Sequence, residues 1–443
     1  MLNLPAYALE AISTLEAAGF EAYVVGGCVR DMLMGKEISD IDITTNALPE
    51  ETKKVFCLKK TIDTGIKHGT VTVLIDRMPV EITTYRIDKG YSDGRHPDSV
   101  AFTRSLKEDL ARRDFTVNAI AYNPKTGIVD PFEGEYDIKN MIIRCVGQAE
   151  KRFGEDALRI LRGLRFSSVL GFTLEAETMS ATINCRQLLK NVSAERIYSE
   201  LSKMLCGKDI RRVLLTYAEV FEEILPELKG MNGFNQRNYH HCFDVLAHTA
   251  AVVSSIEPVP HLRFAALFHD CGKPDCFSVD SDGVGHFYKH ARKSTDKAEA
   301  ALTRLKSDNF TKNRVVQLVK LHDTPIEPKE NVIKKKLGKY GEELFFELIK
   351  LQRADNMGMS PDFRYRQETY GQIEAIAREI LSSKQCFSLK DLAVNGNDLK
   401  TLGISGKDIG LALKKLLSAV IDGKAENTKE ALILYYHTNV KSI

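Results

Sequence analysis

The chain has 443 residues, which at about 100–200 residues per domain predicts about three domains. Hydrophobic residues make up 43% and charged residues 28%, an ordinary globular balance that disfavours a disordered chain, a collagen-like repeat and a small disulfide scaffold. The 62 lysines and arginines nearly balance the 60 aspartates and glutamates, for a formal charge of +2. This balance argues against a uniformly basic protein that coats nucleic acid, but it leaves room for a local basic cleft.

Cysteine usage and the N-terminal sequence bear on the compartment. The nine cysteines are an odd number and form no CxxC pair, so we expect reduced thiols rather than a zinc ribbon or a disulfide framework. The first 20 residues carry acidic side chains and lack the basic start of a secretory signal. No apolar run reaches the length of about 18 residues typical of a transmembrane helix. We therefore expect a cytoplasmic protein with no membrane partner.

The first 145 residues combine helix and strand patterns. Apolar residues at helical spacing predict a helix over residues 6–19. Residues 76–79 suit the turn of a hairpin. Short runs rich in β-branched residues predict strands over residues 22–25, 41–44, 70–75 and 80–85.

From about residue 146 onward the pattern becomes helical. Apolar residues recur at i, i+3 and i+4 over residues 157–168, 195–205 and 245–255, and few alternating runs remain. The sequence therefore predicts an α+β fold in which a head with a mixed sheet precedes an all-helical body.

A glycine pair stands where the first predicted strand meets a short helix. Gly26 and Gly27 follow the strand, and the helix begins near Val29. Glycines at such a turn let a phosphate approach backbone N–H groups, and Arg30 in the first helical turn could bind the same phosphate. A glycine pair is also common in turns that only require a positive φ, so the pair alone leaves both interpretations open.

Two aspartates stand two residues apart at the next predicted strand. Because strand side chains alternate between faces, Asp40 and Asp42 would point to one face, where they could hold divalent cations. Glu81, in the predicted strand at residues 80–85, could add a third carboxylate. Aspartates that merely flank a strand at the surface have the same spacing.

The glycine pair, the early arginine and the DxD strand together resemble the nucleotidyltransferase head of the DNA polymerase β superfamily. Three further segments extend the resemblance: LARRDFTVNAIA at residues 110–121, EDALRILRGLRF at 155–166 and SAERIYSEL at 193–201. In this order they are similar to the class II tRNA nucleotidyltransferases, the CCA-adding enzymes, and to their poly(A) polymerase relatives. The match spans roughly residues 1–205.

The resemblance implies a role for each matching residue in the head. Asp40 and Asp42 would hold Mg²⁺ ions for in-line transfer of a nucleotide to an RNA 3′-hydroxyl. Glu81 is expected as a third catalytic carboxylate because of its predicted strand, not because of the resemblance. Outside this motif, Arg113 would be expected as a solvated helix residue. The residues implied to bind the nucleotide and its triphosphate are Gly26, Gly27, Arg30, Arg113 and Asp114, with Asn118 supporting the site.

The segment at residues 155–166 is predicted as one helix. Asp156 and Arg159 are three residues apart, so they would share one face of this helix. Arg162 and Arg165 follow at the same three-residue spacing. A carboxylate accepts from the exocyclic amine of cytosine or adenine and a guanidinium donates to the ring nitrogen, so this pair would reject guanine and uracil. The resemblance implies that the first pair selects CTP and ATP and that the later arginines neutralise phosphates. An amphipathic helix with surface arginines has the same spacing.

A second cluster of titratable residues lies in the C-terminal half. An apolar helix ending in His269-Asp270 and followed by Gly272 resembles the HD phosphohydrolase motif. The resemblance implies a metal ligand set of His248, His269, Asp270 and Asp355, which suits a second divalent metal and hydrolysis of a phosphate ester. Each histidine taken alone is more often structural than a ligand.

Two further segments are interpreted through the resemblance. Residues 391–433, with Gly403, Gly406 and Gly410 between short helices, resemble the tail with which bacterial CCA-adding enzymes hold tRNA, although a plain helical bundle has similar spacing. The polar segment at residues 88–98 predicts a loop that is either a lid or a connector, and in the family it favours a switch from CTP to ATP.

These observations predict an enzyme that adds CCA to tRNA 3′ ends from CTP and ATP, without a nucleic-acid template and with release of pyrophosphate. The alternatives are an A-adding, CC-adding or poly(A)-adding relative, a phosphohydrolase whose HD site is the main activity, and an RNA-binding protein with an inactive head. The expected parts are a catalytic head (1–145), a neck for base recognition and RNA binding (146–210), a body with the HD domain (211–365) and a tRNA-binding tail (366–443).

Overall fold

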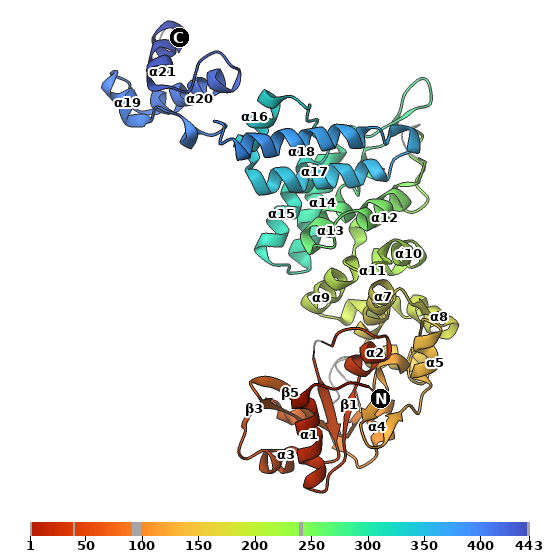
Figure 1. The fold of residues 1–443 in the computed structure, drawn as a ribbon. Coiled ribbons are helices and arrows are strands. Elements are labelled where there is room, and N and C mark those ends of the chain that lie inside the picture. The colour runs from red at the N-terminus through yellow and green to blue at the C-terminus, as the bar shows by residue number, and fades with distance from the viewer. Residues whose placement is uncertain (1, 39, 91–98, 239–241, 441–443) are drawn as a thin grey trace. The chain divides into compact units, whose positions relative to one another are not determined.

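The computed structural model describes residues 2–38, 40–90, 99–238 and 242–440. The chain forms two compact units: one comprises Met1–Lys229 with Arg304–Ser307, and the other Gly230–Thr303 with Asp308–Ile443 (Figure 1). Most of the loop predicted at residues 88–98 lies outside the described residues, which stop at residue 90 and resume at residue 99.

A seven-stranded mixed sheet forms the centre of the first unit. Its strand order is β3-β4-β5-β2-β1-β8-β9, and the only parallel pair among these neighbours is β2 with β5. The four predicted strands are present as β1, β2, β4 and β5. The bounds are β1 (Ala22–Val25), β2 (Asp42–Thr45), β3 (Lys60–Gly65), β4 (Thr70–Ile75), β5 (Met78–Thr84), β8 (Ala121–Asn123) and β9 (Gly127–Val129).

The hairpin between β4 and β5 is tighter than predicted. Asp76 and Arg77 have φ values of 49° and 66°, so the turn has two residues in the left-handed region and β5 begins at Met78. One face of the sheet is covered by α1 (Ala6–Ala17), whose Ile12 and Leu15 are buried in the main apolar core with strand residues. This packing holds the strand ends that carry the acidic residues of the head.

The remaining helices of the first unit are mostly short. The segment at residues 155–166, predicted as one helix, is divided, because Asp156 has extended backbone angles (φ −142°, ψ 103°) between α6 and α7. The bounds are α2 (Gly27–Leu33), α3 (Pro49–Val55), α4 (Leu106–Ala111), α5 (Gly134–Lys139), α6 (Ala149–Glu155), α7 (Leu158–Leu170), α8 (Ala176–Asn184), α9 (Ala194–Leu205), α10 (Ile210–Thr216) and α11 (Ala218–Ile224).

Small two-stranded sheets accompany the main sheet. In the first unit they are β6 (Arg86–Lys89) with β7 (Ser99–Phe102) and β10 (Ile142–Ile143) with β11 (Thr173–Leu174); in the second, β12 (Ser278–Val279) pairs with β13 (Gly285–His286).

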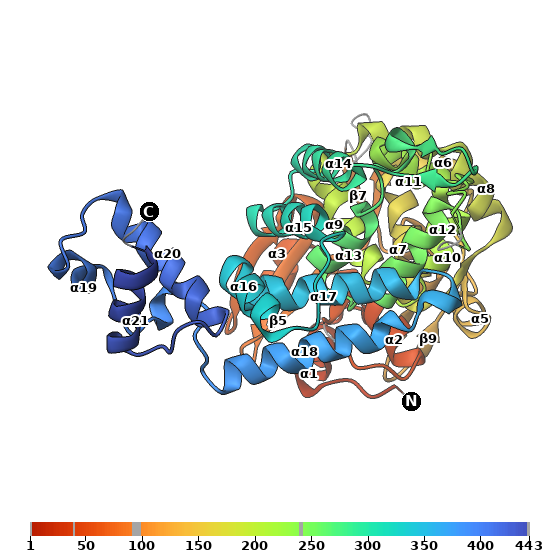
Figure 2. The same cartoon turned by 90° about the horizontal axis from the view of Figure 1, so that it is seen from above.

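The second unit is built around buried helices. The predicted helix at residues 245–255 is α12 (Val245–Ser255), and it packs on α13 (Pro260–Phe268) and α17 (Glu342–Met357). Figures 1 and 2 both show α18 lying along α17, which the residue contacts support. The other bounds are α14 (His290–Arg304), α15 (Asn309–Leu321), α16 (Glu330–Tyr340) and α18 (Arg366–Ser382).

The last helices have a small core of their own. It is formed by Leu399, Leu416, Leu432 and their neighbours, from α19 (Gly396–Thr401), α20 (Lys407–Ile421) and α21 (Lys429–Tyr435). Gly410, predicted to separate short helices, lies inside α20, because the apolar residues on either side of it continue one helical face. Among the described helices, none is long and apolar enough to cross a bilayer.

Candidate functional site

The predicted glycine turn lies at the end of β1. Gly26 has a φ of 87°, which glycine adopts readily and other residues rarely do. A Cβ at Gly26 would lie 3.0 Å from Nη1 of Arg113. The absence of a side chain thus allows both the turn and the close approach of Arg113, while Gly27 begins α2.

Four of the predicted nucleotide-binding residues form one hydrogen-bonded chain. Arg30 donates to Oδ1 of Asn118 at 2.7 Å, and Nδ2 of Asn118 donates to Oδ1 of Asp114 at 3.1 Å. From α7, Arg162 donates to Oδ2 of Asp114, with Nε at 2.8 Å and Nη2 at 2.6 Å. The chain connects the helix after the glycine turn with the helix that follows Asp156.

Asp114 is the central anion of this chain. Its burial would by itself raise the pKa of Asp114, but the charge of Arg162 and the hydrogen bond from Asn118 outweigh burial and hold the pKa at about 2. The carboxylate in turn raises the pKa of Arg162. Both groups are therefore charged over the whole physiological pH range. The positions of Asp114 and Arg162 are fixed by the whole hydrogen-bonded chain, which also includes Asn118 and Arg30, and not by their ion pair alone.

Asp42 and Glu81 lie side by side on neighbouring strands, because the parallel register of β2 and β5 pairs these two residues. Desolvation by the surrounding chain raises the pKa of Asp42; Arg113 lowers it, and the charges of Glu81 and Asp40 raise it again. Mutually repelling carboxylates suit a hard divalent cation, whose charge would relieve the repulsion. The donor set of the head therefore fits a divalent metal.

Asp109 was not predicted as a site residue. Its carboxylate is fully buried, accepts hydrogen bonds from Thr44 at 3.1 Å and from Nε of Arg112 at 3.0 Å, and lies 3.6 Å from Nη2 of Arg113. Burial would raise the pKa of Asp109, but the two arginines outweigh it and the pKa is lowered. Asp109 thus connects Arg113 to Thr44 of β2. In the sequence, the i, i+4 spacing of Asp109 and Arg113 was the signal that could have indicated this ion pair.

Asp156 and Arg159 do not share a helix face, contrary to the prediction. Asp156 lies before α7, where Oδ1 accepts from the amide of Leu158 at 3.0 Å, and this local bond competes with continued helix. Oδ2 of Asp156 lies 2.8 Å from Nη2 of Arg196 on α9. Arg159 donates instead to Glu155 at 2.7 Å.

Phe166 lies among three of the arginines. Its ring centroid is 5.2 Å from Cζ of Arg30, 5.6 Å from that of Arg162 and 4.3 Å from that of Arg165. Stacked guanidinium groups gain about 0.5–2 kcal/mol on an aromatic face, so the ring helps to keep three like charges together. Glu200, 2.7 Å from Arg165, offsets part of that charge.

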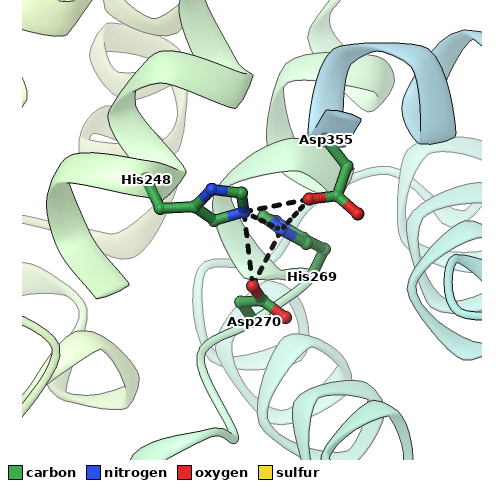
Figure 3. A group of neighbouring side chains, drawn as sticks. All are labelled: His248, His269, Asp270 and Asp355. Carbon is green, nitrogen blue, oxygen red and sulfur yellow. Dashed lines mark hydrogen bonds and ion pairs between the residues drawn. The ribbon is translucent and has the colours of Figure 1, made fainter. Parts of the chain in front are cut away.

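In the second unit, His248, His269, Asp270 and Asp355 converge (Figure 3). Their ligand atoms all lie within 4.8 Å of one another. Nε2 of His248 is 2.9 Å from Asp355 and 3.4 Å from Asp270, and Nε2 of His269 is 3.2 Å from Asp270. These residues come from α12, the end of α13 and α17, so tertiary packing brings the cluster together.

This cluster attracts positive charge. Burial would lower the pKa of His269, but Asp270 and Asp355 outweigh burial and raise it to about 10. Imidazole nitrogens combined with carboxylates are a ligand set for divalent transition metals. The four residues His248, His269, Asp270 and Asp355 therefore fit a metal ion, whose positive charge would be stabilised by the two aspartates.

Three family profiles match parts of the chain. "Poly A polymerase head domain" matches residues 22–144, and "Probable RNA and SrmB- binding site of polymerase A" matches residues 171–231. "tRNA nucleotidyltransferase domain 2" matches residues 286–435.

Relatives match over different lengths. A CCA-adding enzyme of Streptococcus gordonii is 34% identical over 441 residues, which cover 98% of both chains. A CCA-adding enzyme of Lactobacillus delbrueckii subsp. bulgaricus is 51% identical over 224 residues, 50% of this chain and 56% of that relative. The crystal structure of the Bacillus stearothermophilus CCA-adding enzyme in complex with CTP is 33% identical, covers 99% of this chain and 98% of that one, and has a TM-score of 0.74.

Loss of the Arg162 guanidinium is expected to destabilise the first unit. In the variant Arg162→Met, Asp114 remains a buried carboxylate with fewer donors, so the free energy of unfolding at pH 7 should fall by about 2 kcal/mol, a value reduced by the partial exposure of Arg162. Because the native pKa of Asp114 is depressed, its contribution is complete above pH 4 or so and is lost as the pH falls through about 2. The deficit of the variant should therefore shrink below about pH 4.

The matched control is the same substitution in an Asp114→Asn background. Without the carboxylate, Arg162→Met should lower the free energy of unfolding by well under about 1 kcal/mol. The free energies are measured by urea unfolding at several pH values. Equal losses in both backgrounds would show that the pair does not carry the effect.

Proposed function

The chain belongs to the family of CCA-adding enzymes, and from this premise we propose that it adds CCA to the 3′ end of tRNA from CTP and ATP. The reaction needs no nucleic-acid template and releases pyrophosphate. The observation that carries the proposal is the sequence identity with a CCA-adding enzyme over nearly the whole chain. The acidic pair on β2 and β5, next to the arginine-bearing glycine turn, supplies groups suited to nucleotidyl transfer.

In the proposed reaction, Asp40, Asp42 and Glu81 would hold Mg²⁺, and the bound ion would supply Lewis acidity toward the RNA 3′-hydroxyl and positive charge for the leaving pyrophosphate. Arg30 and Arg113 face the glycine turn and neutralise the triphosphate. Asn118 and Asp114 keep Arg30 in place through the hydrogen-bonded chain.

We assign base selection to Asp156 and Arg159. Asp156 accepts from the exocyclic amine of cytosine or adenine, and Arg159 donates to the ring nitrogen. For that contact Arg159 must exchange its bond to Glu155 for one to the base. Arg196 holds the Asp156 carboxylate from α9 and is therefore a positioning residue. Arg162 and Arg165 add positive charge near the phosphates.

The remaining expectations complete the proposal. The helical neck and the tail at residues 366–443 would bind tRNA, and the enzyme would work in the cytoplasm. The four-part division predicted from the sequence is kept as part of this proposal.

A second candidate function belongs to the cluster of Figure 3. Four ligand atoms within 4.8 Å, with two histidines and two aspartates, favour a metal-dependent phosphohydrolase of the HD type. Because these residues belong to the second compact unit and the acidic residues of the head to the first, the two activities should be separable by substitution.

The central prediction concerns product length. With tRNA that lacks its 3′ CCA, CTP alone should yield two added residues, CTP with ATP should yield three, and ATP alone none, as read on a sequencing gel. Long adenosine tails with ATP alone would instead indicate a poly(A)-adding enzyme. Asp42→Asn should reduce incorporation at least a thousandfold, because it removes a metal ligand. It should leave any phosphohydrolase activity intact.

The matched control is Asp63→Asn, which changes a half-exposed carboxylate on β3 of the same sheet. This variant should incorporate nucleotides at the rate of the unaltered enzyme. Equal losses in both variants would point to damage of the sheet rather than to a metal ligand.

Base choice gives a further prediction. Asp156→Ala should lower kcat/KM for CTP and ATP about 10- to 100-fold and narrow their preference over UTP and GTP, because one hydrogen bond to the base is worth about 1–3 kcal/mol. Asp156→Asn keeps an acceptor for the amide of Leu158, so it separates the role at the start of α7 from base selection. Unchanged preference in both variants would remove Asp156 from base selection.

A further inference from the structure

The carboxylate of Glu155, at the end of α6, is shared by two arginines. Nη1 of Arg152 donates to its Oε2, and Nη1 of Arg159 lies 2.7 Å from the same oxygen. The three side chains are mostly buried, with exposed fractions of 12% for Arg152, 19% for Glu155 and 10% for Arg159. One anion that is largely removed from water therefore has two cations beside it.

In this arrangement Arg159 is bonded to the protein and not to a base. Besides its bond to Glu155, Nη1 of Arg159 donates to the carbonyl oxygen of Arg152 at 2.8 Å, and Nη2 lies 3.5 Å from that of Arg112. Base selection requires Arg159 to turn its donors to a ring nitrogen. Glu155 would then lose one of its two cations, and a mostly buried carboxylate without a cation is unfavourable.

The other cation, Arg152, is fixed by the backbone that follows α4. Its Nη2 donates to the carbonyl oxygen of Arg112 and to that of Arg113, the latter at 3.0 Å. Carbonyls at the end of a helix lack partners within the helix and form the negative end of its dipole, so a guanidinium is favourable there. Because these acceptors are backbone atoms, they keep Arg152 beside Glu155 when Arg159 leaves.

We propose that Arg152 is a positioning residue that releases Arg159 for base selection by keeping Glu155 paired. While Arg159 is bonded to Glu155, the carboxylate oxygen is divided between two guanidinium groups, so each is held less strongly than in an isolated pair. When Arg159 turns to cytosine or adenine, Arg152 remains as the partner of Glu155. The inference rests on the proposed base selection by Asp156 and Arg159 and adds the residue that makes the exchange possible.

Arg152 also bonds to the peptide that carries Arg113, which is proposed to neutralise the triphosphate. A change in that peptide would weaken the binding of all four nucleoside triphosphates to the same extent, because their triphosphates are identical. A change in the release of Arg159 would instead weaken CTP and ATP more than UTP and GTP. The ratio of kcat/KM for CTP over UTP therefore isolates the effect that passes through Glu155.

The test removes the guanidinium first and then the carboxylate, in the full chain with tRNA that lacks its 3′ CCA. In Arg152→Met, Glu155 depends on Arg159 and retains it. The ratio for CTP over UTP should therefore fall about tenfold, mainly through a higher KM for CTP. Adding Glu155→Gln removes the charge that retains Arg159, and hydrogen bonds to a neutral oxygen are weaker. The ratio should then return to within about threefold of that of the unaltered enzyme.

Two further variants control for loss of charge and loss of folding. Lys151→Met removes an exposed cation from the same helix and should leave the ratio unchanged. Arg152→Lys keeps a positive charge but lacks the planar fork that serves Glu155 and two carbonyls at once, so the ratio should fall about threefold. It replaces Arg152→Met in the test if thermal unfolding shows that Arg152→Met does not fold.

The outcomes separate this inference from the proposal on which it rests. An unchanged ratio in Arg152→Met or, where it is needed, in Arg152→Lys would overturn the role of Arg152 and leave base selection by Asp156 and Arg159 in place. A reduced ratio that Glu155→Gln does not restore would also overturn it, because the loss would then come from damage around α6. If the unaltered enzyme shows no preference for CTP over UTP, the proposed base selection fails, and this inference with it.

Discussion

The buried carboxylate of Asp114 is the point on which the catalytic head depends. It receives hydrogen bonds from Asn118 and Arg162, and Asn118 in turn holds Arg30 beside the glycine turn. A buried anion is costly unless it is fully paired, so these donors must be placed correctly for the unit to be stable. The requirement links the glycine turn of the sheet with α7, and the arginines that suit a triphosphate are fixed as a consequence.

In the second unit, the buried carboxylate with a comparable position among its neighbours is that of Asp270. Its two oxygens face four imidazole nitrogens, each directed by a hydrogen bond from the other ring nitrogen to a backbone carbonyl. The head uses carboxylates from neighbouring strands, whereas this site uses imidazole and carboxylate groups from helix ends. The two donor sets suit different ions: hard oxygen ligands favour Mg²⁺, and imidazole favours a transition metal.

Most of the elements around the head site were predictable because they obey local rules. The β-branched runs of β1, β4 and β5 and the glycine pair define strand ends and a turn. Of the two aspartates predicted to share a strand face, Asp42 begins β2, whereas Asp40 precedes the strand and is not placed by strand alternation. Asp156 was misplaced for a local reason as well: its side chain bonds to the amide of Leu158, which no apolar periodicity reveals. Asp109 was missed because the sequence does not show that its carboxylate is buried. Without that information, its i+3 and i+4 spacing to Arg112 and Arg113 is typical of ion pairs on an exposed helix.

The sequence by itself determined the α+β order of the chain, the family resemblance and the residue types of both sites, since these depend on spacing and composition along the chain. Only the tertiary structure decided which groups meet. The parallel register of β2 and β5 sets Glu81 beside Asp42, and helix packing brings His290 and His322 to Oδ1 of Asp270. Such contacts join residues many positions apart, and their geometry follows from burial of the apolar faces around them. The near-zero net charge of the chain thus says little about its partners, because packing gathers arginines in one place and carboxylates in another.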